Sequence, residues 1–413
     1  MIEIKDKSLC CGCHACLNAC PKQCIAMHED NEGFLYPFVD KEKCIDCGLC
    51  EKVCPVINQG EPRKPLKVYA AKNRDEAIRM QSSSGGIFTL IAEKVIAEGG
   101  VVFGAKFNKQ WEVIHAYTDN LNGLADFRGS KYVQSIIGNT YSEVLKFLKE
   151  GRKVLFSGTP CQIAGLKKFL RKEYENLLTI DVACHGVPSP MIWNIYLNET
   201  CSKIRGIKPD GKNSVHSAKG GEYKSCIEAI SFRSKITGWK KYSFMLKPNF
   251  FNYDGKNTEK KISQKAADNI FMKGFLRNIY LRPSCYACAA RFGKSGSDIC
   301  IGDFWGVENF YPQFDDDKGI SLLLINSQNG LNAYNNITAE SIESNYEYAI
   351  KYNPVLEHSV TIPKNKELFW KEFERNPTMD CVNKFTKTNV PLLLKIYYKC
   401  RLVASTIVKK IYN

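Results

Sequence analysis

The stretch CCGCHACLNACP, at residues 10–21, recurs as CIDCGLCEKVCP at residues 44–55. Both copies have the spacing Cys-x2-Cys-x2-Cys-x3-Cys-Pro, so the chain begins with an internal repeat. Three thiolates on one tight loop can bind three corners of a 4Fe-4S cluster, and the fourth thiolate must come from elsewhere. We therefore predict two clusters that exchange their fourth ligands. The first set is Cys10, Cys13, Cys16 and Cys54, and the second set is Cys44, Cys47, Cys50 and Cys20.

Zinc is the main alternative for this array, because zinc sites also use Cys-x2-Cys pairs. A zinc site needs two pairs, however, and has no use for a third cysteine and an x3-Cys-Pro ending, so the spacing favours iron and sulfur. Two nearby cysteines fall outside the spacing. We expect Cys11 to be a bystander at a variable loop position and Cys24 to be a small buried apolar residue.

The composition is that of a folded protein of two to three domains, with 413 residues, 24% charged and 44% hydrophobic. No stretch reaches the roughly 18 consecutive apolar residues of a membrane span, and no signal peptide is recognisable, so we expect a cytoplasmic protein. In a reducing compartment, 19 cysteines indicate metal or redox chemistry rather than disulfides. The net charge of +15 invites a nucleic-acid partner, but thiolate-bound clusters would lower it. No helix-turn-helix or basic-aromatic array is present, so we expect no nucleic-acid partner.

Beyond a polar linker at residues 58–65, β-rich runs alternate with helical patterns. This alternation predicts an α/β sheet with helices on its faces and ligands beyond the carboxyl ends of strands. The predicted strands are 68–71, 101–103, 113–116, 153–156 and 178–182, and the predicted helices are 87–98, 141–150 and 162–170.

Three loops carry residues suited to a cofactor phosphate or ring. The first loop opens the helix at 87–98, where backbone N–H groups and hydroxyls can hold an anion, with N-capping by Ser84 as the alternative. The second loop offers cations and an aromatic ring, and the third offers a carboxylate beside two aromatic rings, although a surface charge or a core aromatic residue is the usual explanation of such residues. The candidate residues are Ser82, Ser83, Ser84, Gly85 and Gly86, then Gly129, Ser130, Lys131 and Tyr132, and finally Asp303.

A second group of cysteines lies in the middle of the chain. Cys161 and Cys184 each follow a predicted strand, and Cys285 and Cys288 form a Cys-x2-Cys pair about a hundred residues later. Four thiolates can meet there as a third cluster. Three alternatives stay open from the residues alone: a structural zinc site, a redox-active disulfide, or a set in which Cys300 replaces Cys161 or Cys184.

These motifs resemble the coenzyme F-420 hydrogenase/dehydrogenase family (beta subunit), here fused to a segment that resembles a two-cluster bacterial ferredoxin. The resemblance covers about residues 5 to 310 and implies a flavoprotein that binds FAD beside a 4Fe-4S cluster. It implies that Cys161, Cys184, Cys285 and Cys288 bind this third cluster, and that the three loops lie at the FAD. The hydrogenase type lacks the ferredoxin segment, so no deazaflavin partner is implied. Bacterial relatives often accompany polysaccharide-synthesis genes, which suggests a link to that process. The motifs that carry the resemblance are residues 84–86, 129–132, 158–162, 184–188, 282–288, 297–298 and 302–306.

We therefore expect a multidomain protein of the α+β and α/β classes. A ferredoxin-like domain is expected at 1–60, an α/β FAD and 4Fe-4S domain at 61–310, and a mostly helical extension at 311–413. The amphipathic basic helix at 392–413 is expected to dock on its own domain, with peripheral contact to the inner face of a membrane as the alternative.

The expected function is electron transfer between a low-potential one-electron donor, such as a ferredoxin or another redox protein, and a two-electron small-molecule acceptor. Clusters carry single electrons and a flavin exchanges them in pairs, which is why these cofactors occur together. The alternative is a non-catalytic electron-transfer subunit of a larger complex. No Gly-x-Gly-x-x-Gly fingerprint is present, which disfavours direct NAD(P)H use. We assign no catalytic residue, and we expect His185 to be structural.

Overall fold

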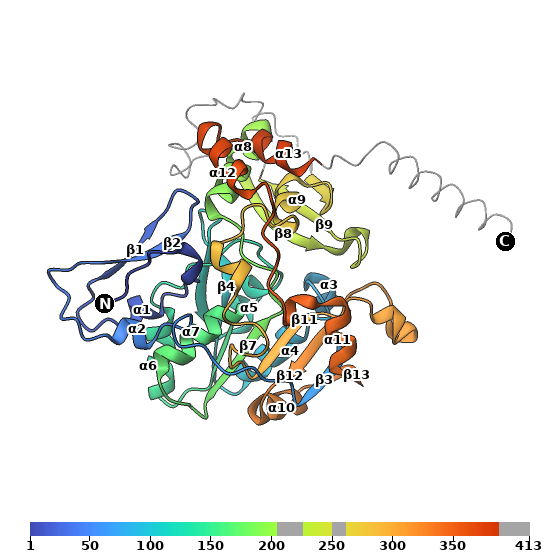
Figure 1. The fold of residues 1–413 in the computed structure, drawn as a ribbon. Coiled ribbons are helices and arrows are strands. Elements are labelled where there is room, and N and C mark those ends of the chain that lie inside the picture. The colour runs from blue at the N-terminus through green and yellow to red at the C-terminus, as the bar shows by residue number, and fades with distance from the viewer. Residues whose placement is uncertain (205–225, 250–261, 388–413) are drawn as a thin grey trace.

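A computed structural model describes residues 1–204, 226–249 and 262–387. The helix expected over 392–413 lies outside these residues. The centre of the molecule is an eight-stranded mixed sheet (Figure 1). Its strands are β3 (Lys67–Asn73), β4 (Val101–Phe107), β5 (Val113–Thr118), β6 (Val154–Gly158), β7 (Leu177–Val182), β11 (Ile299–Asp303), β12 (Ser321–Ile325) and β13 (Ala339–Ser344).

The strands of this sheet lie in the order β13-β3-β12-β11-β7-β6-β4-β5. The four central strands β4, β6, β7 and β11 run parallel, and antiparallel strands flank them on both sides. The strand and helix alternation expected from the sequence is confirmed. The sheet also continues across residue 310, because β12 and β13 both pair with β3. The extension expected to be mostly helical from 311 onward therefore begins with strands of the central sheet.

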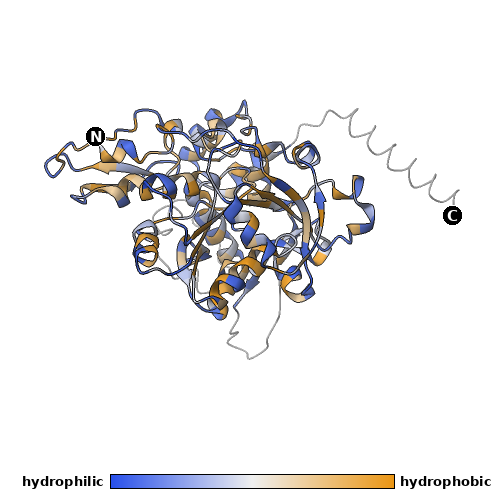
Figure 2. Cartoon of the chain, turned by 90° about the horizontal axis from the view of Figure 1, so that it is seen from below, coloured by the Kyte–Doolittle hydropathy of each residue, from blue (hydrophilic) through white to orange (hydrophobic). Residues whose placement is uncertain are grey.

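Helices cover both faces of the sheet. Alternate side chains of the central strands point to opposite faces, and each set packs against different helices. Val102 and Leu155 pack with α4 (Ile87–Ala97) and α10 (Gln328–Asn335), whereas Phe103 and Phe156 pack with α6 (Thr140–Lys149) and α7 (Pro160–Leu170). Hydrophobic residues accordingly run along the strands in the middle of the molecule (Figure 2).

The N-terminal repeat packs on the α6 and α7 side of the sheet. It contains α1 (Ala15–Ala19), α2 (Leu49–Lys52) and an antiparallel hairpin of β1 (Ile25–Glu29) and β2 (Leu35–Val39), and it projects from one side of the molecule (Figure 1). Its Cys13 belongs to the same hydrophobic core as α6 and α7. The approach is close, because a Cβ atom added to Gly165 of α7 would lie 2.8 Å from Cβ of Cys13.

A second, three-stranded sheet completes the fold. It consists of β8 (Ile227–Ser234), β9 (Ser243–Pro248) and β10 (Ile262–Lys265). The buried side chains of Trp193, Phe232 and Phe271 join it to the surrounding helices. These helices are α8 (Pro190–Ile204), α9 (Ile270–Leu276), α12 (Lys366–Arg375) and α13 (Met379–Thr386).

Short helices fill the connections between these elements. The remaining α-helices are α3 (Glu76–Gln81), α5 (Leu121–Leu124) and α11 (Tyr346–Tyr352). The 3-10 helices are η1 (Lys7–Leu9), η2 (Ala125–Phe127), η5 (Lys235–Thr237), η6 (Pro283–Ala287), η7 (Val307–Asn309), η8 (Pro312–Phe314) and η9 (Pro354–Leu356). Within the three described ranges, no helix has the length and apolarity that crossing a bilayer requires.

Candidate functional site

The second predicted set of cysteines lines one cavity at the outer end of the N-terminal repeat. The cavity holds about 350 Å³ of space, part of it open to solvent. Cys20 reaches it from the end of α1, whereas Cys50 reaches it from α2 in the other copy of the repeat. The cysteines that line it are Cys20, Cys24, Cys44, Cys47 and Cys50.

The first predicted set is more deeply buried. Burial raises the pKa of Cys16 to about 12, and the nearby charges of Cys10 and Cys54 add to the rise. Thiols crowded in this way stay protonated at neutral pH unless a cationic core binds them, and iron–sulfur ligation supplies such a core. The chemistry of this donor set therefore fits a 4Fe-4S cluster.

The middle group of cysteines lines a larger cavity, which lies between the N-terminal repeat and the central sheet. The cavity holds about 610 Å³, part of it open to solvent, and η6 and the start of α7 contribute to its wall. Burial raises the pKa of Cys285 to about 12. The cysteines that line the cavity are Cys11, Cys161, Cys184, Cys285 and Cys288.

Cys11 and Cys24, which we expected to take no part in cluster binding, both lie close to the predicted ligand sets. The sulfur of Cys24 lies 3.3 Å from the sulfur of Cys20. The pKa of the Cys11 thiol is raised, and the thiols of both Cys13 and Cys161 lie close enough to influence it. Cys11 thus links a cysteine of the first set to one of the middle group, although its position outside the spacing gave no indication of this.

The described cysteines surround volumes rather than a single point. A zinc ion needs ligand sulfurs about 2.3 Å from one centre. Among the residues that the structure describes, no group of three or more His, Cys, Asp or Glu side chains is arranged to hold one metal ion. Each of the two cavities is lined by five thiols, which is enough to supply the four ligands of a four-iron cluster.

The three loops proposed for the flavin lie together around Arg233 of β8. The Arg233 guanidinium forms a buried ion pair with Asp303, 2.6 Å long, and donates a hydrogen bond to the hydroxyl of Tyr132. The hydroxyl of Ser83 accepts a 2.7 Å hydrogen bond from the backbone N–H of Ser130. The sequence offered no reason to select Arg233, which is a single arginine in an otherwise ordinary strand.

The hydroxyls of the first loop point into the protein. Ser82 donates to the carbonyl of Ile78, and Ser84 donates to the carbonyl of Ile320. The alternative of N-capping by Ser84 is wrong, because the N-cap of α4 is Gly86, whose φ of 82° suits a residue without a side chain. An anion at this loop would therefore contact backbone N–H groups rather than these two hydroxyls.

Two lysines beside these loops donate hydrogen bonds from their ammonium groups to backbone carbonyls. Burial lowers the pKa of Lys131 to about 7, and its Nζ donates to the carbonyls of Arg128 and Gly129. Burial also lowers the pKa of Lys235 to about 7. A phosphate or a reduced flavin at this site would stabilise the charged form of either lysine.

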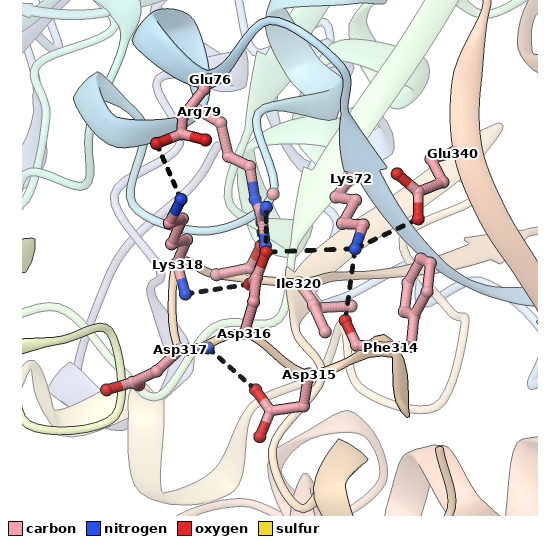
Figure 3. A network of polar contacts seen from close by, with 12 residues as sticks. Lys72, Glu76, Arg79, Phe314, Asp315, Asp316, Asp317, Lys318, Ile320 and Glu340 are labelled. Carbon is pink, nitrogen blue, oxygen red and sulfur yellow. Dashed lines mark hydrogen bonds and ion pairs between the residues drawn. The ribbon is translucent and has the colours of Figure 1, made fainter. Parts of the chain in front are cut away.

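A network of ion pairs stabilises the elements on either side of the first loop, residues 82–86. Arg79, at the end of α3, pairs with Asp316, while Lys72 of β3 bonds to the carbonyl of Phe314 and pairs with Glu340 (Figure 3). These contacts fix α3 against the segment that precedes β12. The loop that follows α3 is positioned as a result.

His185 lies beside Cys184 and takes a structural role. Its Nε2 bonds to Oδ1 of Asn278 at 2.6 Å, and its ring packs edge-on against Phe275. Burial lowers its pKa, so the neutral imidazole is favoured. This environment agrees with the role expected from the sequence.

The cysteine repeat and the cysteine-lined cavities define an iron–sulfur electron-transfer protein. Residues 9–58 match the 4Fe-4S dicluster domain family, and residues 151–346 match the family described as the C terminus of the beta subunit of coenzyme F420 hydrogenase/dehydrogenase. The chain therefore carries an N-terminal ferredoxin-type 4Fe-4S domain, followed by a region that matches the F420 hydrogenase/dehydrogenase beta-subunit family.

Individual relatives match separate parts of the chain. It is 24% identical to the F subunit of F(420)H(2) dehydrogenase from Methanosarcina mazei over 190 residues, which covers 43% of this chain and 53% of that protein. It is 26% identical to the coenzyme F420-dependent sulfite reductase of Methanocaldococcus jannaschii over 201 residues, covering 45% of this chain and 29% of that protein. The chain thus spans about half of the first relative and less than a third of the second.

The N-terminal part has ferredoxin relatives. It is 39% identical to the 7Fe ferredoxin of Hydrogenibacillus schlegelii over 64 residues, which covers 15% of this chain and 76% of that protein. Among solved structures, a chain of the F420-reducing [NiFe] hydrogenase complex from Methanosarcina barkeri aligns over 78% of this chain and 91% of its own length, with a TM-score of 0.41 and 15% identity. The ferredoxin match supports 4Fe-4S binding by the repeat.

Proposed function

We propose that this chain is a flavin-dependent iron–sulfur oxidoreductase. It passes electrons between a low-potential one-electron donor of the ferredoxin type and a two-electron small-molecule acceptor, through three 4Fe-4S clusters and FAD. The proposed cluster ligands are the first set, the second set and the middle group of Cys161, Cys184, Cys285 and Cys288. Bound clusters supply single-electron transfer, and bound FAD supplies the exchange between single electrons and pairs.

The observation that carries the proposal is the position of Cys11, which lines the middle cavity together with Cys161 and lies close enough to Cys13 for that thiol to shift its pKa. The Cys11 thiol therefore lies between Cys13 of the first set and Cys161 at the wall of the middle cavity. Cys47 of the second set is exposed, which makes that set accessible to a donor protein. The residues therefore support a route from the surface, through the repeat, to the centre of the molecule.

The proposed FAD site is the cluster of loops around Arg233. Three cations, Lys131, Arg233 and Lys235, lie among backbone carbonyls and one partly buried carboxylate, Asp303. This arrangement suits a dinucleotide phosphate or a reduced flavin ring. The further expectation of a link to polysaccharide synthesis remains a prediction.

Composition analysis of the full chain tests the proposal. After anaerobic purification we expect about twelve iron, twelve sulfide and one FAD for each chain, because three clusters hold four irons each. About eight irons without flavin would contradict it and leave two clusters alone.

The second candidate is an electron-transfer subunit without catalysis of its own. It is favoured by the relative in Methanosarcina mazei, which is itself named as one subunit of a dehydrogenase. The two candidates separate when the loaded chain alone is supplied with a reduced ferredoxin and a two-electron acceptor such as a quinone. Sustained turnover supports the oxidoreductase, whereas cluster reduction without turnover supports the electron-transfer role.

A further inference from the structure

Arg282 is a buried cation at the boundary between the N-terminal repeat and the rest of the molecule. Its side chain is 1% exposed, and it lies directly before η6, which carries Cys285. Its Nε donates a 2.8 Å hydrogen bond to the carbonyl of Cys10, and one terminal nitrogen donates to the carbonyl of Leu35. A single guanidinium thus joins segments more than 240 residues apart in the sequence.

No acceptor of Arg282 that the structure describes is a carboxylate. Besides the two carbonyls, the guanidinium bonds to the amide oxygen of Gln134 at 2.9 Å and to the sulfur of Cys10 at 3.6 Å. The ring of Tyr36 lies 4.3 Å from its central carbon. Burying a charge without a counter-charge is costly, so a negative group is expected nearby.

Sulfur supplies this negative charge on two sides. The sulfur of Cys10, from the first set, bonds to the guanidinium, and Cys285, from the middle group, lines the same cavity as Arg282. Arg282 also lines the middle cavity itself. A 4Fe-4S core of about +2 with four thiolates has a net charge of about −2, and reduction makes it about −3.

We propose that Arg282 is the shared counter-cation of the first and third clusters and raises the reduction potentials of both relative to the second cluster. An adjacent cation stabilises the more negative, reduced state more than the oxidised state, which raises the potential. The second cavity is not lined by Arg282. Its lining includes Met1, whose N-terminal ammonium is paired with Asp46 at 2.9 Å, and Lys22, whose exposed side chain is screened by solvent. Transfer of an electron from the exposed second cluster to the first and third clusters is therefore favourable.

This inference rests on the proposed function for the third cluster but not for the first. Redox titration of the full chain under anaerobic conditions, followed by electron paramagnetic resonance, tests it. In Arg282→Gln we expect two of the three one-electron steps to move to more negative potential while the remaining step stays in place. Arg152→Gln is the charge-matched control, because Arg152 bonds to Gly99 just before β4, at the end of the central strands opposite to Cys161, and we expect no shift.

A second variant keeps the arginine and neutralises it in place. Gln134→Glu puts a carboxylate on the guanidinium with nearly the same shape, so we expect the same two steps to shift in the same direction. This variant loses the hydrogen bond from Gln134 to the carbonyl of Cys11, but it keeps every bond from Arg282 to the repeat. Gln134→Glu therefore tests the role of Arg282 even if Arg282→Gln does not retain its iron.

Two results overturn the inference: all three steps unmoved, or all three moved equally. The iron content of the wild type separates its failure from failure of the proposed function. If the wild type contains about eight irons, the third cluster is absent and the proposed function fails, but the first cluster must still shift in Gln134→Glu. If twelve irons are present and nothing shifts selectively, the role of Arg282 fails alone.

Discussion

Arg233 and Asp303 form an ion pair in which both side chains are largely buried, with 4% and 14% of their surface exposed. Asp303 also accepts a 2.7 Å hydrogen bond from the indole of Trp239. The pair connects the second sheet to the end of β11 in the central sheet. It therefore holds together the loops that we propose for the flavin.

Removing the carboxylate from this pair should be costly. In Asp303→Asn the Arg233 charge stays buried without its counter-ion, so we expect the free energy of unfolding to fall by about 3–5 kcal/mol. Flavin content should fall as well. Urea denaturation followed by circular dichroism measures the first effect, and absorbance of the released flavin measures the second.

Asp126→Asn is the matched control for that variant. It breaks the half-exposed pair with Lys106, also 2.6 Å long, and a change below about 1 kcal/mol is expected. Equal losses in the two variants would show that the buried pair does not organise the site.

The ligands of the third cluster can be separated from the neighbouring cysteine. Both Cys288 and Cys11 line the middle cavity, but only Cys288 belongs to the proposed ligand set. We expect Cys288→Ser to lower the iron content from about twelve to about eight, and Cys11→Ser to leave it at about twelve. Iron analysis of anaerobically purified protein measures both. Loss of iron in Cys11→Ser with none in Cys288→Ser would require a different ligand set.

His115 gives the protein a specific sensitivity to acid. Burial lowers its pKa from 6.5 to about 4, while Nε2 bonds to the carbonyl of Ser157 and Nδ1 to the hydroxyl of Ser135. Below pH 6.5 the unfolded chain binds a proton at this residue that the folded chain does not bind. Stability from this group is therefore complete above about pH 6.5 and is lost as the pH falls to about 4, by up to about 3 kcal/mol.

Urea denaturation at pH 7.5 and pH 5 measures this effect. His115→Gln should reduce the difference in unfolding free energy between the two pH values, because glutamine does not titrate. His358→Gln, at a side chain that is 78% exposed, should leave the difference unchanged. An unaltered difference in His115→Gln would assign the acid sensitivity to other groups.

The contact of α7 with the N-terminal repeat can be tested at Gly165. A Cβ atom at this position would lie 2.8 Å from Cβ of Cys13 and 2.9 Å from its sulfur. The hydroxyl of Tyr141 would lie 3.0 Å from the same atom. Alanine is intrinsically better than glycine in a helix by about 1 kcal/mol, so any loss in Gly165→Ala comes from these close approaches. We expect a lower melting temperature and partial loss of the first cluster, measured by calorimetry and iron analysis. A melting temperature above that of the wild type would show that the repeat does not rest on Gly165.

The local parts of the site could be predicted from the sequence, whereas the remote parts could not. The cysteine repeat and the strand and helix alternation between 68 and 182 are patterns within short windows, and the structure confirms the alternation. Arg233 and Arg282 acquire their importance only from partners far away in the chain. A single buried arginine has no spacing or periodicity that would indicate its role.

The strands after residue 310 show a second limit. The residues SLLLI of β12 are all buried, because hydrophobic clusters cover both faces of the sheet at this strand. A short continuous apolar run of this kind does not distinguish strand from helix by its period. Its pairing with β3, about 250 residues earlier, depends on the complete fold.

The position of β3 has a consequence for how the protein is made. This strand follows the N-terminal repeat directly, yet both of its neighbours, β12 and β13, are among the last strands of the chain. During synthesis, the backbone N–H and C=O groups at both edges of β3 have no strand to pair with until most of the polypeptide has left the ribosome. The repeat can take up iron early, but the sheet on which it rests closes late. Assembly of the two clusters proposed for the repeat can therefore precede folding of the body, and in that interval the unpaired edges of β3 are exposed to aggregation.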